Sequence, residues 1–104
     1  MEQRRRRSHS RMTRKHPVLP LFRILGVPVR VAVLQRVARR PATASELAKE
    51  LPVTRTAIVQ HLGVLRRHGL VDTTQDGRRQ VYRAVPAGLA PLREWLDTYG
   101  KRPN

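Results

Sequence analysis

The chain has 104 residues, of which 39% are apolar and 28% are charged. This length and composition allow one small hydrophobic core and exclude a second domain of useful size. The net charge of +15 favours a polyanionic partner, either nucleic acid or an anionic membrane. Because the chain contains no cysteine, it cannot form a disulfide framework or a cysteine metal site, and we expect a cytoplasmic protein.

Residues 1–16 form a basic tail with seven Lys and Arg residues and one acidic residue, Glu2. The tail lacks the apolar residues that a core needs, so it is expected to be disordered when free. It either remains a solvated tail or acts as an arm that follows DNA phosphates or enters a minor groove. Residues 17–99 then form the folded domain, which is also basic, and residues 100–104 form a second short basic tail.

The apolar run over residues 18–37 superficially resembles the hydrophobic segment of a leader or a membrane helix. Arg23, Arg30 and Arg36 interrupt it, and each would cost about 2.5–3.5 kcal/mol near the centre of a membrane helix. We therefore expect no membrane partner. The spacing of the apolar residues instead predicts two amphipathic helices, the second beginning near Pro28.

Residues 43–69 predict two short helices joined by a tight turn. Thr43 can cap the first helix, and Glu46 can return a hydrogen bond to the backbone N–H of the cap, which makes a capping box. Pro52 biases the residue before it away from helical geometry and so ends this helix. This arrangement is typical of a helix-turn-helix.

The second helix of this pair is expected over residues 55–67, with Thr54 as its N-cap and Gly69 ending it. On its exposed face, Gln60 can pair with adenine and Arg55 with guanine or phosphate, while Val59 can contact a thymine methyl group. Its expected buried face consists of Ile58, Leu62 and Leu65. The predicted DNA-binding residues are Thr54, Arg55, Thr56, Val59, Gln60 and His61, together with Arg78 and Arg79 at the tip of the following hairpin.

Residues 70–85 predict that hairpin, a two-stranded wing, because β-branched and aromatic residues flank the turn dipeptide Asp76-Gly77. After Pro86 the helical spacing returns. This last helix can pack within the chain, but an aromatic-rich terminal helix on so small a protein favours half of a dimer interface. The predicted interface residues are Leu21, Phe22, Leu92, Trp95, Leu96 and Tyr99.

The order of these elements predicts a mainly α-helical winged helix-turn-helix with a small β-hairpin. The residues that support it are ELAKELPVTRTAIVQHLGVLRRHGLV (46–71), DGRRQVYR (76–83) and GLAPLREWL (88–96). Through these segments the chain resembles the ArsR-type transcriptional repressors over roughly residues 19–97. The resemblance implies a homodimer that represses transcription by binding an operator in double-stranded DNA. Relative to this family, Val59 stands where a small hydroxyl residue is common, and Gly63 where a basic residue often sits.

Other functions lack support in the sequence. His61 and His68 are seven residues apart, too far along a helix to chelate one metal ion, so we predict no metal and no cofactor. His68 is instead interpreted as a charge at the helix end. The acidic residues form no evident catalytic pair, which argues against an enzyme.

The alternative to a repressor is a basic winged-helix module that binds structured RNA or acts as a nucleoprotein scaffold. No inducer is indicated.

Overall fold

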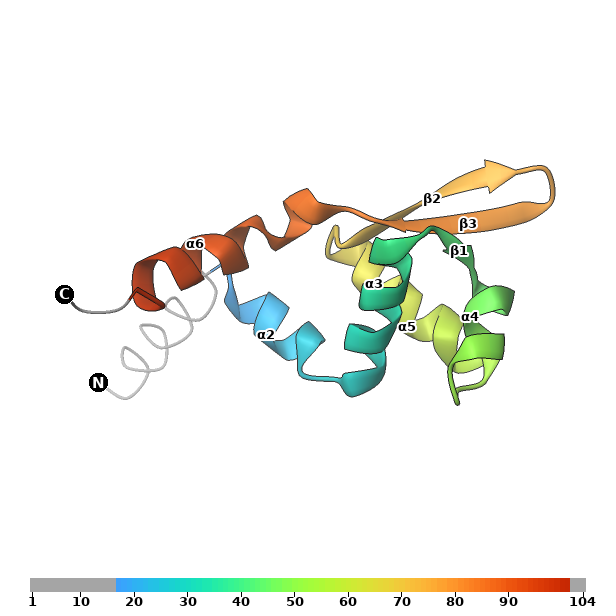
Figure 1. The fold of residues 1–104 in the computed structure, drawn as a ribbon, viewed down its shortest axis with the longest axis horizontal. Coiled ribbons are helices and arrows are strands. Elements are labelled where there is room, and N and C mark those ends of the chain that lie inside the picture. Colours follow the sequence, from blue (N-terminus) through green and yellow to red (C-terminus); the bar gives the residue numbers. More distant parts are fainter. Residues whose placement is uncertain (1–16, 102–104) are drawn as a thin grey trace, which may run out of the picture.

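The computed structural model describes residues 17–101, and the expectations for the remaining tail residues lie outside this range. The helices are α2 (Leu19–Leu25), α3 (Pro28–Arg39), α4 (Ala44–Glu50), α5 (Arg55–Arg67), the 3-10 helix η1 (Pro86–Leu89) and α6 (Ala90–Tyr99). The strands are β1 (Ala42–Thr43), β2 (Val71–Asp76) and β3 (Arg79–Ala84). The predicted winged helix-turn-helix is confirmed (Figure 1). In the described part, no helix has the length and apolar character needed to cross a membrane.

The ends of α4 and α5 are fixed by the residues that the sequence indicated. At the start of α4, the Thr43 hydroxyl accepts the backbone N–H of Glu46 at 3.1 Å, and the Glu46 carboxylate accepts the N–H of Thr43 at 3.0 Å. At the start of α5, the Thr54 hydroxyl accepts the N–H of Ala57 at 3.1 Å. Gly69 follows the C-cap of α5 with a φ of 72°, a conformation that glycine adopts at little cost.

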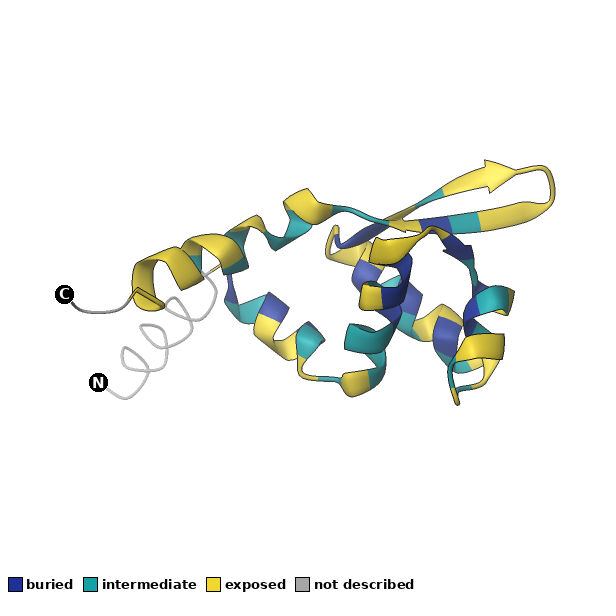
Figure 2. Ribbon diagram, viewed as in Figure 1, coloured by how far each residue is buried: buried dark blue, intermediate teal, exposed yellow. Residues whose placement is uncertain are grey.

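The hydrophobic core lies among α2, α3, α4, α5 and the base of the sheet (Figure 2). The predicted inner face of α5 is confirmed, because its three apolar residues are fully buried. Together with residues of α3 and α4, they form the centre of the core: Val33, Leu47, Ile58, Leu62 and Leu65. Fully burying a side chain of this kind contributes about 1.5–3 kcal/mol, so this cluster fixes the position of α5.

The sheet has three antiparallel strands in the order β1-β3-β2, whereas the sequence predicted only the two strands of the wing. The added strand, β1, pairs Ala42 with Tyr82 and Thr43 with Val81. A two-residue strand is too short to show an alternating pattern, and its pairing with a distant segment leaves no local signal. It attaches the wing to the start of α4.

The turn of the wing is also displaced by one residue from the prediction. Asp76 is the last residue of β2 and pairs with Arg79, so the loop consists of Gly77 and Arg78. Gly77 has a φ of 62°, and no non-glycine residue in the described range has a positive φ. A positive φ at the first loop residue alone is typical of a type II′ turn, which matches the twist of the strands.

α6 extends away from the core, at the opposite end of the molecule from the wing (Figure 1). No residue of α6 is buried. Its connection to the core depends on Gly88 in η1. A Cβ atom at this position would lie 2.2 Å from the carbonyl oxygen of Gly69, so the two backbone segments touch only because Gly88 has no side chain.

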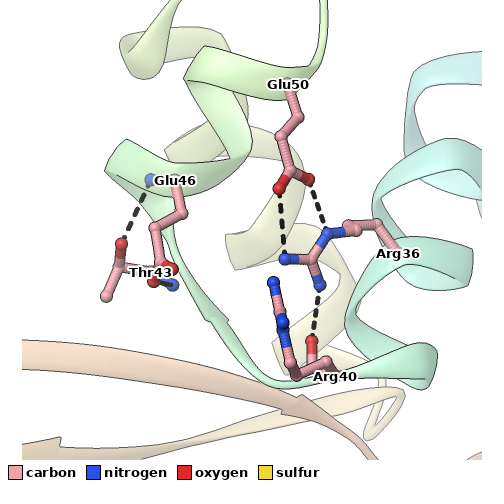
Figure 3. A network of polar contacts seen from close by, with 5 residues as sticks. All are labelled: Arg36, Arg40, Thr43, Glu46 and Glu50. Carbon is pink, nitrogen blue, oxygen red and sulfur yellow. Dashed lines mark hydrogen bonds and ion pairs between the residues drawn. The ribbon is translucent and has the colours of Figure 1, made fainter.

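A polar network joins the C-terminal ends of α3 and α4 (Figure 3). Arg36 is buried and forms a bidentate ion pair with the Glu50 carboxylate through Nε and Nη2. Its Nη1 donates to the carbonyl oxygen of Arg40 at 2.7 Å. The hydrogen bond from Arg36 holds the pKa of Glu50 below its ordinary value, and Glu50 in turn raises the pKa of Arg36. The pair therefore stays charged over the neutral range.

We expect Gly88→Ala to lower the free energy of unfolding by about 1–3 kcal/mol, because the new methyl group must push η1 away from Gly69. Urea unfolding followed by circular dichroism measures the change. Gly63→Ala is the control: a Cβ there meets only the Arg67 guanidinium, at 3.8 Å. That substitution should stabilise α5 by up to about 1 kcal/mol. Equal changes in the free energy of unfolding for the two substitutions would contradict the role of Gly88 in the contact between η1 and Gly69.

Stability should fall as the solution is acidified. The depressed pKa values of Glu46 and Glu50 mean that their stabilising contribution is complete above the ordinary value of 4.5 and is lost as the pH falls through their lower folded values. Thermal unfolding between about pH 6 and about pH 3 tests this. Glu50→Gln should make the melting temperature less sensitive to pH, whereas Glu94→Gln, which removes a carboxylate in no ion pair of the described chain, should not.

Candidate nucleic-acid interface

The N-terminal turn of α5 is held against α4 by side chains that can also contact a phosphate. Arg55 Nε donates to Ser45 Oγ at 3.1 Å, which ties the first residue of α5 to the first turn of α4. Both partners are exposed, so the remaining N–H groups of Arg55 can reach a ligand. The Thr54 hydroxyl caps the helix as an acceptor, which leaves its own O–H free to donate.

The outward face of α5 contains most of the side chains predicted to read bases. Thr56, Val59 and Gln60 are exposed, and Val59 retains 41% of its accessible surface. An exposed valine of this size has no role in the core and is available for an apolar contact, such as one with a thymine methyl group. His61 is half-buried, so it presents less surface than its neighbours.

The wing is attached to the helix-turn-helix by an ion pair next to its turn. Arg79 Nη2 lies 3.1 Å from Glu46 Oε1, the same oxygen that accepts the Thr43 N–H in the capping box. Hydrogen bonds from Thr43, followed by the nearby charge of Arg79, keep the pKa of Glu46 below its ordinary value. The carboxylate therefore stays ionised, and the arginine of the wing is directed towards α4. Arg78 occupies the loop and is exposed.

A groove of about 520 Å³ lies between the start of α4, the first turns of α5 and the wing. It brings together four of the predicted DNA-binding residues: Arg55, Val59, Arg78 and Arg79. The other predicted residues, Thr54, Thr56, Gln60 and His61, do not line this groove. The groove thus presents three arginines, and the exposed face of α5 continues from it.

Three exposed polar residues of the groove were missed by the sequence reasoning: Ser45, Gln75 and Gln80. Ser45 follows the α4 cap by two residues, and only the fold shows that it contacts Arg55. Gln75 and Gln80 are paired across the hairpin. Their symmetric positions on either side of the turn were a usable signal, because directly paired residues share one face of the sheet.

A second exposed surface, which we call the aromatic arm, is formed by α2 and α6. Phe22 and Trp95 make an edge-to-face contact with ring centroids 5.2 Å apart, and Tyr99 lies 5.2 Å from Trp95. Phe22, Leu96 and Tyr99 keep 41%, 50% and 66% of their surface exposed. Leu92 is half-buried against the core.

Leu21 differs from the other residues predicted for a dimer interface. It is only 4% exposed and belongs to the core of its own chain, because α2 directs Leu21 and Ile24 inwards and Phe22 outwards. Its position indicates a structural role in α2, with almost no surface left for a partner.

The histidines of the described chain lie on or next to α5. Within residues 17–101, His, Cys, Asp and Glu side chains form no group of three that could hold a metal ion. His68 is the C-cap of α5, and its Nδ1 lies 3.0 Å from the carbonyl oxygen of Val64. This position agrees with the interpretation of His68 as a group at the helix end.

Comparison with known proteins supports the architecture. A family model for a helix-turn-helix domain matches residues 25–74. The HTH-type transcriptional regulator Rv2034 of Mycobacterium tuberculosis is 45% identical over 81 residues, covering 78% of this chain and 76% of that protein. The M. tuberculosis HTH-type transcriptional repressor SmtB is 33% identical over 72 residues, covering 69% of this chain and 53% of that protein.

Among solved structures, an ArsR-like transcriptional regulator from Rhodococcus sp. RHA1 superposes with a TM-score of 0.72 at 36% identity. The match covers 81% of this chain and 79% of that chain. Sequence and structure comparisons therefore agree over most of the chain. The chain belongs to the ArsR-type winged helix-turn-helix regulators, which are DNA-binding transcriptional regulators and not enzymes.

Proposed function

We propose that the protein is a homodimeric repressor that blocks transcription by occupying an operator in double-stranded DNA. The observation that carries the proposal is the groove between α5 and the wing, where Arg55, Arg78 and Arg79 flank an exposed helix face. Phosphates attract such a surface, while the side chains of α5 reach base edges. Occupation of an operator in bacterial DNA also places the protein in the cytoplasm.

In the proposed complex, the N-terminal half of α5 enters the major groove. Gln60 pairs with adenine, and Arg55, held by Ser45, contacts guanine or a phosphate. Thr54 and Thr56 contact phosphates near the helix start, where free N–H groups and the helix dipole favour anions, and His61 contacts a phosphate from the middle of α5. Arg78 lies at the tip of the wing and reaches a phosphate or the neighbouring minor groove.

The aromatic arm supports the dimer. A monomer that exposes Phe22, Leu96 and Tyr99 on one side leaves apolar surface in water, and a second copy can cover it. A two-fold axis through α6 presents two α5 helices to one face of the duplex. The operator is then a pseudo-palindrome with half-sites about 34–36 Å apart or a multiple of that spacing.

Fluorescence anisotropy with DNA from the protein's own upstream region, scrambled DNA and a structured RNA, across a salt series, tests this function. We expect upstream DNA to bind about 10³-fold or more tightly than scrambled DNA near physiological salt, with two protomers per site. If all three polymers bind alike and weaken together as salt rises, charge explains the binding. The module that binds RNA or acts as a scaffold then replaces the repressor.

Gln60→Ala and Arg78→Ala should have different effects on DNA binding. Loss of a base contact by Gln60→Ala should reduce specific affinity by about 1–3 kcal/mol and leave scrambled DNA almost unaffected. Loss of a phosphate contact by Arg78→Ala should weaken both DNAs and reduce the salt slope by about one. The same anisotropy series gives the salt dependence of DNA binding by each variant and the ratio of its affinities for specific and scrambled DNA. Identical profiles for the two variants would rule out this division of roles.

Leu96→Glu should convert the dimer to a monomer and reduce operator affinity, because it places a charge in the aromatic arm. Thr98→Glu, on another side of the same helix and also exposed, is the matched control and should leave the dimer intact. Sedimentation equilibrium measures the oligomeric state, and circular dichroism verifies the fold. A wild-type monomer, or a Leu96→Glu variant that remains dimeric, would contradict the proposed interface.

A further inference from the structure

A small cavity of about 330 Å³ lies where α2, α3 and the C-terminal end of α5 meet. Its lining residues are Pro20, Arg23, Ile24, Arg30 and His68. Three of these carry nitrogen donors that are positively charged or can become so, and none is acidic. The sequence analysis used the two arginines only to exclude a membrane helix, and the DNA-binding groove uses none of the five.

The Arg30 side chain contains an unusual polar atom. Its Nε is buried, and it is the one buried side-chain nitrogen or oxygen in residues 17–101 without a hydrogen-bond partner. A guanidinium cannot lose its proton at physiological pH, so this donor cannot be neutralised. Buried donors of this kind in native proteins are normally satisfied by a protein group, a water molecule or an ion.

No acidic side chain in the described chain balances this charge. The ion pairs within residues 17–101 are Arg36–Glu50 and Arg79–Glu46, which involve neither Arg23 nor Arg30. His68 adds a further donor or acceptor. Its Nδ1 is engaged with the Val64 carbonyl, which can only accept, so Nδ1 carries the hydrogen and Nε2 remains available.

We propose that this cavity is a binding site for a small oxyanion of the phosphate class. Arg30 lines the cavity, and its planar guanidinium carries Nε and Nη donors in the fork that matches two oxygens of a tetrahedral oxyanion. Arg23 supplies the second positive charge, and His68 Nε2 accepts from a P–OH group or, when protonated, donates to an oxygen. A hydrogen phosphate ion offers four oxygens to these three side chains, whereas a halide ion offers a single acceptor atom.

The position of the cavity favours a free ion over a phosphate of the bound operator. His68 is thirteen residues after Arg55, so the two lie about 20 Å apart along α5, at opposite ends of the helix. The cavity also adjoins α2, which carries Phe22 of the aromatic arm. An oxyanion held here would bridge α2, α3 and the end of α5, and so stabilise the folded protein.

The test uses the full chain with inorganic phosphate as the probe, at constant ionic strength maintained with sodium chloride. NMR should show saturable, one-to-one shifts of the Arg30 Nε–H and His68 signals, and the melting temperature should rise as the site fills. Arg30→Lys keeps the charge but loses the fork, and Arg23→Gln removes the positive charge of an exposed side chain. Each should weaken phosphate binding about ten-fold or more.

Arg39→Gln is the matched control, because Arg39 is an exposed arginine of α3 that does not line the cavity. It should bind phosphate like the wild type. Shifts that do not saturate, or equal binding by wild type and Arg30→Lys, would overturn the proposal, with a water molecule satisfying Arg30 instead. The same variants assayed for operator binding identify the source of the phosphate. If free phosphate does not bind but Arg23→Gln reduces the salt slope of DNA binding, the site contacts the DNA backbone, and a free ligand is refuted. If the wild-type protein does not recognise the operator, only the repressor function is refuted.

Discussion

The burial of one face of α5 is the constraint on which the DNA-reading surface depends. Ile58, Leu62 and Leu65 are fully buried against α3 and α4, so the opposite face cannot turn away from solvent. The side chains on the exposed face do not have to pack against the core, because the buried face already fixes the orientation of α5. In the proposed complex, their chemistry is therefore free to vary with the operator, while the apolar residues behind them fix the orientation of the helix.

Glu46 links three features of the interface with one carboxylate. It completes the capping box of α4, and the same oxygen pairs with Arg79 of the wing. Because Thr43 also belongs to β1, the cap of α4 and the third strand of the sheet share one residue. The helix-turn-helix and the wing are thus joined by hydrogen bonds and strand pairing at one point. These contacts fix the position of the wing relative to the helices on the other side of the groove.

At one end of the molecule the strands and a charged side chain have partners within the described chain, whereas at the other end apolar surface and positive charge do not. At the wing end, the strands are paired and Arg79 has its ion-pair partner. At the other end, α6 buries no residue, and the cavity beside α2 concentrates positive charge around an unpartnered arginine nitrogen. Apolar surface and unbalanced charge therefore lie together at the end remote from the DNA-reading turn. The proposed second copy of the chain would cover the apolar surface, and the proposed oxyanion would balance the charge.

The sequence by itself determined the helices, the caps and the inner face of α5, because each rests on residues within a few positions of one another. The helix ends depend on local contacts, which can be predicted from the sequence: Thr43 with Glu46, Thr54 with Ala57, and Gly69 after α5. Tertiary structure alone decided the features that join distant segments. The β1–β3 pairing, the Ser45–Arg55 contact, the burial of Leu21 and the cavity around Arg30 depend on how the helices pack. No periodic pattern encodes them, since each needs side chains that the fold brings together from separate elements.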